Sequence, residues 1–295
     1  DITVAALIRR LAEHHDVEPE RIAVGCGSVA LCQQLVSAVC SPGDEVVFAW
    51  RSFEAYPIVT LIGHAVAVPV PLTPGHVHDL DALAAAITDR TRLVFVCNPN
   101  NPTGTAVRRA ELEAFLARVP DHVLVVLDEA YREFVTDPEV PDGLTLLDAH
   151  PRVVVLRTFS KAHRLAGLRV GYAVGPADLA AALRSVSVPF SVSTPAQAAA
   201  MAALDVLDEL LADARGAATE LARMATALRG MGYEVPESQA NFLWLPLGGR
   251  TQAFTDHALD HKVVVRGFSP DGVRISAGAP DENDLLIDAA SSFPG

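Results

Sequence analysis

The feature that most constrains the fold of this chain is the alternation of apolar runs with helical stretches from residue 21 to about residue 185. Every residue of the run Val123-Leu124-Val125-Val126-Leu127 is apolar. A strand with one solvent-exposed face would instead alternate apolar and polar residues. Uninterrupted runs of this kind are typical of strands buried on both sides. The pattern therefore predicts an α/β domain over residues 1–188, with a mostly parallel sheet covered by helices on both faces.

The expected elements of this domain follow from the same pattern. Strands are predicted at residues 22–24, 45–49, 65–70, 93–97, 124–128, 153–158 and 169–174. Helices are predicted at residues 29–39, 53–62, 80–86, 109–118 and 176–185, after a first helix marked by Val4, Leu7, Ile8 and Leu11.

After Pro189 the composition changes, and we expect a smaller α+β domain over residues 189–295. It begins with a long, alanine-rich helix at residues 196–229, with a break near residues 212–216. A strand at 240–246, a helix at 251–261, strands at 263–266 and 273–276, and a final helix from Asp281 complete it.

Charge and composition exclude several classes of protein. The formal net charge of −13, from 23 basic and 36 acidic residues, argues against a nucleic-acid or anionic-membrane surface. No apolar stretch approaches the length of a membrane span, and no signal peptide opens the chain. The four cysteines show neither metal-ligand spacing nor disulfide density. We therefore expect a cytoplasmic protein with no metal site, no nucleic-acid partner and no membrane contact.

Three of the expected strands end in polar motifs. The strand at 93–97 leads into Asn98-Pro99-Asn100-Asn101-Pro102-Thr103-Gly104, the next ends at Asp128, and the strand at 153–158 leads to Lys161. Ligands of open α/β sheets bind at the carboxyl ends of the strands. The three motifs are therefore expected to meet at one site.

The motif around Lys161 suits a phosphorylated aldehyde. A lysine amine can bond covalently to a carbonyl carbon, and the hydroxyls of Thr158 and Ser160 with the guanidinium of Arg169 can bind a phosphate dianion. Upstream, Gly25-Cys26-Gly27-Ser28 precedes a helix starting near Val29, and backbone N–H groups at a helix N-terminus bind anions. The same glycines are also compatible with a plain strand-to-helix turn.

Together with Asp128-Glu129-Ala130-Tyr131, these motifs resemble the fold-type I aminotransferases that use pyridoxal phosphate (PLP), and within them the histidinol-phosphate aminotransferase family. The resemblance covers essentially the whole chain and implies PLP-dependent transferase fold type I, transamination and a homodimer. It implies that Lys161 bonds to PLP and shuttles the substrate's α-proton. It also implies that Asp128 pairs with the pyridine nitrogen, and that Tyr131 and Asn101 bond to the 3′-oxygen, with a cis bond between Asn101 and Pro102.

The resemblance assigns further residues to the cofactor and the substrate. Ser28, Val29, Thr158, Ser160 and Arg169 would surround the phosphate. Phe53 is the expected partner of the ring's open face, with Trp50 as its rival, and Tyr56 is a candidate wall of the substrate pocket, a dimer contact or a core residue. Arg274 matches the arginine that grips the α-carboxylate, and Arg266 matches a second basic position near the substrate tail.

The substrate class is open at this point. Residues 25–34 and 50–57 are similar to the actinobacterial branch of aromatic or phenylalanine aminotransferases, which makes an aromatic amino acid the first expectation and histidinol phosphate the second. A PLP decarboxylase of the same fold is a more distant reading, as is a regulator that carries a DNA-binding module upstream.

The chain opens at Asp1, directly before the first helical pattern, whereas family members carry an N-terminal arm there. In many relatives a tyrosine from the partner subunit's arm touches the phosphate. We therefore expect a form that begins at Asp1 to bind PLP but to turn over poorly.

Overall fold

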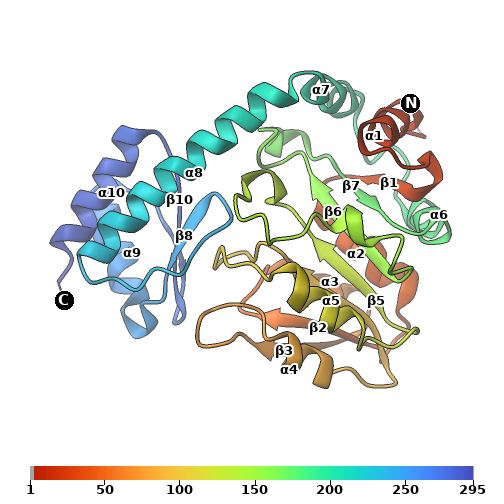
Figure 1. The fold of residues 1–295 in the computed structure, drawn as a ribbon, viewed down its shortest axis with the longest axis horizontal. Coiled ribbons are helices and arrows are strands. Elements are labelled where there is room, and N and C mark those ends of the chain that lie inside the picture. The colour runs from red at the N-terminus through yellow and green to blue at the C-terminus, as the bar shows by residue number, and fades with distance from the viewer. Residues whose placement is uncertain (1–2, 295) are drawn as a thin grey trace.

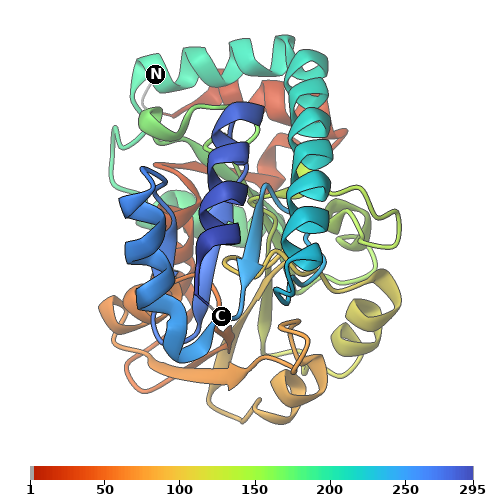
Figure 2. The same ribbon diagram turned by 90° about the vertical axis from the view of Figure 1, so that its left-hand side faces the viewer.

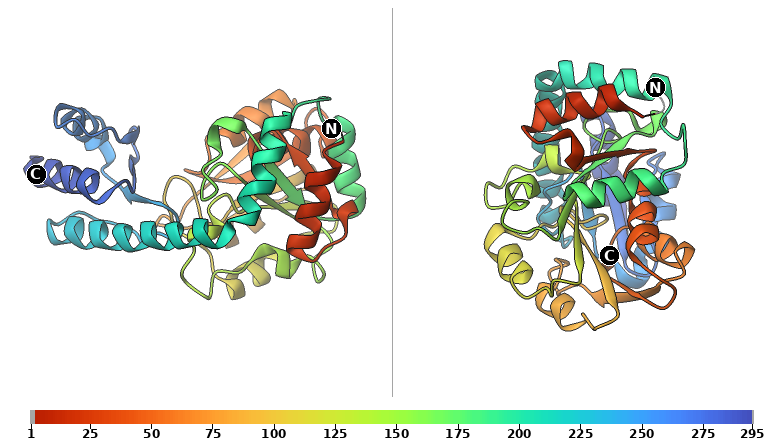
Figure 3. Two further views of the ribbon diagram at one scale, coloured as in Figure 1. Left: turned by 90° about the horizontal axis from the view of Figure 1, so that it is seen from above. Right: turned by 90° about the vertical axis from the view of Figure 1, so that its right-hand side faces the viewer.

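The computed structural model describes residues 3–294. A large body built on a seven-stranded sheet lies beside a smaller body built on a three-stranded sheet (Figure 1). Helix α8 (Leu207–Gly230) runs between them, and seen from above it extends as a long arm toward the small body (Figure 3). Figure 2 shows the small body from its outer side, where its helices lie in front of its sheet.

The large sheet has the strand order β1-β7-β6-β5-β4-β2-β3. Strands β2 to β6 run parallel to one another, and β7 alone runs antiparallel to both of its neighbours, β6 and β1. The expected mostly parallel sheet is confirmed. The strand bounds are Ile22–Gly25 (β1), Glu45–Trp50 (β2), Val66–Pro71 (β3), Thr91–Cys97 (β4), Leu124–Asp128 (β5), Val153–Thr158 (β6) and Gly171–Val174 (β7).

Helices cover both faces of this sheet, which explains the uninterrupted apolar runs. In β4, Val94 and Val96 belong to one core, whereas Leu93 and Phe95 belong to the other. The first core is closed by residues of α1 (Ala5–His15), α4 (Leu80–Ala85), α5 (Arg109–Leu116) and α7 (Thr194–Asp205). The second is closed by residues of α2 (Ser28–Val39), α3 (Ala55–Ile62) and α6 (Ala177–Val186). Alternate side chains of β4 are thus buried on opposite faces.

The small body is an antiparallel sheet in the order β8-β10-β9, formed by Phe242–Leu245 (β8), Gly272–Ser276 (β10) and Arg266–Phe268 (β9). Its core joins Leu243 of β8 and Ile275 of β10 to Leu228 of α8. Helices α9 (Thr251–Asp260) and α10 (Pro280–Ser292) complete the cover. Short 3-10 helices occur at Pro19–Arg21, Arg132–Phe134, Gly143–Leu146, Ala166–Leu168 and Gly248–Arg250.

Two expected details of the second half are wrong. The alanine-rich helix breaks at Val206, where φ is −111° and ψ is 24°, while residues 212–216 lie inside α8. Asp208 and Glu209 in the first turn of α8 favour a new helix start there, because acidic side chains stabilise helix N-termini. The strand expected at residues 263–266 is displaced along the chain. Strand β9 begins only at Arg266, because the ladder to β10 spans Arg266 to Phe268.

The division of the chain at residues 188 and 189 stays a prediction. Ala196 and Ala200 of α7 pack in the same core as Leu7 and Leu11 of α1, so this helix joins the large body although it follows that boundary. Packing therefore favours a division near Val206.

Among residues 3–294, no helix is both long enough and apolar enough to cross a membrane. The described residues also contain no group of three or more His, Cys, Asp or Glu side chains that could hold a metal ion.

Candidate active site

A cavity of about 210 Å³ opens at the carboxyl ends of β4, β5 and β6. The structure brings together in its wall all of the residues expected to bind the cofactor. They are Ser28, Val29, Phe53, Asn101, Asp128, Tyr131, Thr158, Ser160, Lys161 and Arg169. The convergence of strand ends predicted from the sequence is thus observed, while each residue's role toward PLP stays a proposal.

Lys161 lies just after β6 in the cavity wall, with its Nζ 5.2 Å from the centre of the Tyr131 ring. Burial, together with the positive charges of Arg274 and Arg169, lowers the pKa of its amine below the ordinary lysine value. The charge of Asp128 opposes this shift. A lysine with a lowered pKa carries a neutral, nucleophilic amine for a larger fraction of the time.

Asp128 is the last residue of β5 and is 2% exposed. Its Oδ2 accepts a hydrogen bond from Tyr56 Oη at 2.8 Å, whereas its Oδ1 is buried and has no partner among the described residues. Burial raises the pKa of the carboxyl, and the Tyr56 hydroxyl, the backbone N–H of Ala130 and Lys161 oppose that rise. A buried carboxylate oxygen without a partner in a cavity wall fits a cationic ring N–H of a ligand.

The phosphate end is built by the start of α2. Gly27 has a φ of 79°, and a Cβ at this position would collide with the Arg169 guanidinium. Arg169 Nη1 lies 3.3 Å from Ser160 Oγ and also donates to the Ala166 carbonyl at 2.8 Å. The helix N-terminus at Ser28 and a guanidinium therefore sit side by side, which is the donor set that a phosphate dianion requires.

Asn101 connects the cavity to the small body. Its Oδ1 accepts from Nη1 of Arg274 on β10 at 2.6 Å, and its bond to Pro102 is cis, as expected. Because the guanidinium occupies the amide oxygen, the amide NH₂ is left to donate elsewhere. Arg274 Nε is buried without a partner among the described residues, so the guanidinium retains donor capacity for a ligand.

The structure separates the aromatic candidates. Phe53 lines the cavity, whereas Trp50 lies outside its wall and packs against Phe48 and the guanidinium of Arg51. This placement favours Phe53 as the residue that covers the ring. Of the three alternatives for Tyr56, its placement favours a core residue over a wall of the substrate pocket, because it is 0% exposed and donates to Asp128.

Arg266 is placed away from the cavity wall. It is exposed, and its Nη2 pairs with Glu54 Oε2 at 3.1 Å. A guanidinium that already has a carboxylate partner is less available to a substrate. Arg274 does not line the wall either, but it bonds to the wall residue Asn101, so it is the better placed of the two arginines.

Cys97, Ala130 and Ala166 also line the cavity and were missed from the sequence. Cys97 could have been found, because it ends the strand that leads into the asparagine loop, and Ala130 lies between Asp128 and Tyr131. Ala166 begins the short 3-10 helix after Lys161, where the sequence carries no such signal. Burial raises the pKa of the Cys97 thiol to about 12, so this group is an inert wall rather than a nucleophile.

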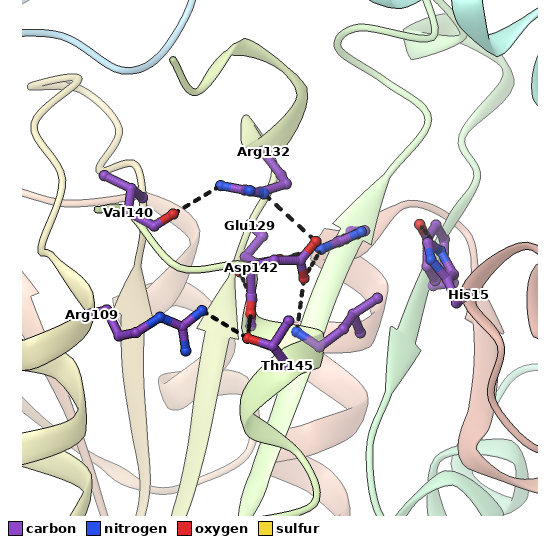
Figure 4. A network of polar contacts seen from close by, with 11 residues as sticks. His15, Arg109, Glu129, Arg132, Val140, Asp142 and Thr145 are labelled. Atoms are coloured by element: carbon purple, nitrogen blue, oxygen red, sulfur yellow. Dashed lines mark hydrogen bonds and ion pairs between the residues drawn. The ribbon is translucent and has the colours of Figure 1, made fainter. Parts of the chain in front are cut away.

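A buried ion-pair network supports the two central strands beneath the site. Arg157 of β6 donates to Glu129 Oε2 from Nη2 at 2.8 Å and from Nε at 3.1 Å, and to Asp142 Oδ1 at 2.6 Å. Figure 4 shows Glu129, Asp142 and Arg132 lying close together, with His15 further off. Glu129 is the residue after Asp128, and Arg157 is the residue before Thr158. The ion pair therefore links the two chain segments that carry these site residues.

The comparisons with known proteins agree with this geometry. Residues 1–289 match the family described as aminotransferase class I and II. The chain belongs to this family. The expected family, PLP-dependent transaminase activity and cofactor are thereby confirmed. The paired helix terminus and arginine, the unpartnered Asp128 oxygen and the lowered pKa of Lys161 fit that cofactor.

The chain is similar to curated relatives in sequence and to solved structures in fold. It is 57% identical to the aromatic amino acid aminotransferase of Streptomyces coelicolor, covering 99% of this chain and 82% of the relative. It is 56% identical to the protein of that name from Mycobacteroides abscessus, covering 96% and 81%. The structure of histidinol-phosphate aminotransferase from Sinorhizobium meliloti in complex with pyridoxal-5′-phosphate superposes with a TM-score of 0.92 at 31% identity, covering 99% of this chain and 82% of that one. The expected fold type is confirmed.

Proposed function

We propose that this aminotransferase moves the amino group of an aromatic amino acid to a 2-oxo acid. The observation that carries the proposal is the 55–57% identity to curated relatives named aromatic amino acid aminotransferase, set against 31% to the histidinol-phosphate aminotransferase structure. The donor leaves as its 2-oxo acid, and the acceptor becomes the amino acid.

The chain's own residues divide the work of this reaction. When bound, PLP supplies an aldehyde that takes up the amino group and a ring that accepts electrons as the α-proton leaves. Lys161 would hold the resting cofactor through its Nζ, and the same amine would move the α-proton of the substrate. Arg274 holds the α-carboxylate with its planar fork, which also orients the reacting C–H bond.

The remaining cavity residues prepare the cofactor. Asp128 would keep the ring nitrogen protonated, while Tyr131 and the amide of Asn101 would hold the 3′-oxygen. Phe53 would cover one face of the ring and help to exclude water, and the α2 terminus with Arg169 would anchor the phosphate.

A second candidate is the transamination of histidinol phosphate. It is favoured by the TM-score of 0.92 to an enzyme of that name. This substrate has no carboxylate, so Arg274 and Arg266 would hold its phosphate instead. In the structure Arg266 is already paired with Glu54, which weighs against this assignment.

Steady-state kinetics separate the two candidates. The PLP-loaded protein is assayed with 2-oxoglutarate as acceptor and with phenylalanine, tyrosine or histidinol phosphate as donor. The first proposal requires kcat/KM for the aromatic donors to exceed that for histidinol phosphate by about tenfold or more, a difference of ~1.4 kcal/mol in transition-state binding. The reverse order would replace it with the second.

We also propose a cytoplasmic homodimer. The four cysteines are free thiols, which suits a reducing compartment. Helix α3 exposes Ile58, Leu61 and Ile62, which are 58%, 75% and 51% exposed, and contiguous apolar surface of this kind is typical of an interface. Sedimentation velocity of the purified protein tests the dimer, and a monomer at micromolar concentration would contradict it.

A further inference from the structure

We propose that Tyr56 is a positioning residue that holds the Asp128 carboxylate by one oxygen and turns the other oxygen to the cofactor's ring nitrogen. The proposal is based on one contact, in which Tyr56 Oη donates to Asp128 Oδ2 at 2.8 Å. Tyr56 is 0% exposed and Asp128 is 2% exposed. The inference rests on the assignment of PLP to the cavity. It gives a function to a side chain that lies outside the cavity wall.

Tyr56 is held in a single orientation by its surroundings. Its ring stacks on Phe95 with the centroids 4.3 Å apart and the planes 10° apart, and Phe53 packs edge-on at 5.6 Å. Phe48 closes a third side at 5.9 Å. Because the ring is fully buried among aromatic groups, its hydroxyl has no access to water, and Asp128 is the acceptor that satisfies it.

The Tyr56 hydroxyl affects two properties of the Asp128 carboxylate, its orientation and its charge. A carboxylate can rotate about its terminal bond, and a donor fixed on Oδ2 removes that freedom. The rotation that satisfies Tyr56 leaves Oδ1 buried in the cavity wall without a partner among the described residues. The unsatisfied oxygen is therefore the one presented to a ligand.

The second property is the charge of Asp128. Full burial disfavours the anion, and a hydrogen bond donated to the charged form favours it. The other titratable groups that act on this pair are Lys161, Cys32 and Cys97. Burial raises the pKa of both thiols, so these groups favour their neutral forms. Tyr56 and Lys161 are then the side chains that favour the anionic form of Asp128.

The test uses Tyr56→Phe, which removes the hydroxyl and keeps the ring on Phe95. The dissociation constant of PLP is measured by titrating the apoprotein, and the protonation state of the bound cofactor is read from the ¹⁵N chemical shift of PLP labelled at its ring nitrogen. We expect the affinity to fall about tenfold, as for loss of a hydrogen bond to a charged group, and the resonance to move toward that of neutral pyridine.

Tyr233→Phe is the matched control. It loses a hydroxyl that donates to the Ala290 carbonyl at 2.8 Å in the small body. Its PLP dissociation constant and its ¹⁵N chemical shift should therefore match those of the unaltered protein. Asp128→Asn marks the full effect of losing the carboxylate. In that background, adding Tyr56→Phe should change the PLP dissociation constant by less than about twofold, because the two residues act as one unit.

Three results would overturn the proposal. The first is a Tyr56→Phe protein that keeps the PLP affinity and ring-nitrogen shift of the unaltered protein, whatever its unfolding temperature, since that is the behaviour of an ordinary core tyrosine. The second is a full Tyr56→Phe effect on top of Asp128→Asn. The third is an unaltered protein that binds no PLP, which would remove the cofactor assignment as well and so is distinguishable from the other two.

Discussion

Arg274 Nη1 and Asn101 Oδ1 are 2.6 Å apart, although 173 positions separate the two residues in the chain. The contact ties β10 of the small body to the loop that follows β4 of the large one. It fixes the direction of the Asn101 amide and brings a guanidinium next to a residue of the cavity wall, although Arg274 itself does not line that wall. The cavity wall itself is built by the large body, and this contact links it to the small body.

Substitution of Arg274 by lysine should weaken the grip on the substrate. Lysine keeps the charge but loses the planar fork that holds a carboxylate by two parallel bonds. We expect kcat/KM for phenylalanine to fall by about 100-fold, or ~2.7 kcal/mol, chiefly through KM. Arg250→Lys, at an exposed arginine that donates to the Pro294 carbonyl, is the control and should change kcat/KM little. Equal kinetics of the two variants would remove Arg274 from the substrate site.

Gly27→Ala should displace Arg169 and loosen the phosphate end. Gly27 has a φ of 79°, and the added methyl group would meet the guanidinium, whose flexible side chain must move away. We expect weaker PLP binding, measured by titration of the apoprotein. Gly43→Ala is the matched control, since Gly43 has a φ of 89° and nothing within 4 Å of the added Cβ. It should lower the free energy of unfolding by about 1 kcal/mol and leave PLP affinity unchanged. Unchanged affinity in both variants would argue against a phosphate at this loop.

The pKa of Lys161 predicts how PLP association depends on pH. Burial and the charge of Arg274 lower this pKa, so the association rate of PLP with the apoprotein should rise with pH and level off below the ordinary lysine value of 10.5. Removing a cation favours the protonated amine, so Arg274→Ala should move the midpoint to higher pH. Asp128→Asn removes an anion and should move it to lower pH. Stopped-flow mixing at a series of pH values checks both directions, and shifts of the same sign would contradict this electrostatic picture.

The Glu129–Arg157 pair should matter for stability. Arg157→Met leaves the buried carboxylate of Glu129 without its partner, and breaking a buried pair in this way costs about 3–5 kcal/mol. Chemical denaturation of the apoprotein should therefore show a much lower midpoint. Arg223→Met is the control, because Arg223 pairs with Glu220 and Asp284 at the surface, and it should change the midpoint little. Similar midpoints for the two variants would show that the buried pair is not needed for stability.

The site was largely predictable because its residues stand at the ends of apolar strands. Asp128 and Lys161 follow runs that can only be buried, and the carboxyl ends of neighbouring parallel strands meet by geometry. Arg274 was assigned through resemblance alone, since nothing near it in the chain indicates a substrate site, and its role stays a proposal.

The role of Tyr56 could not be read from the sequence. Its partner Asp128 is 72 positions away, and an aromatic residue after a strand suits a pocket wall or a core equally well. The same limit applies to β9, which depends on tertiary pairing that outweighs local propensity.

The most direct test is the visible absorption spectrum of the purified protein with PLP, before and after phenylalanine is added, together with that of Lys161→Ala. We expect a yellow band that depends on Lys161 and that phenylalanine bleaches as the amino group passes to the cofactor. A band that persists in Lys161→Ala, or that no amino donor bleaches, would contradict the assignment of Lys161 and of transamination.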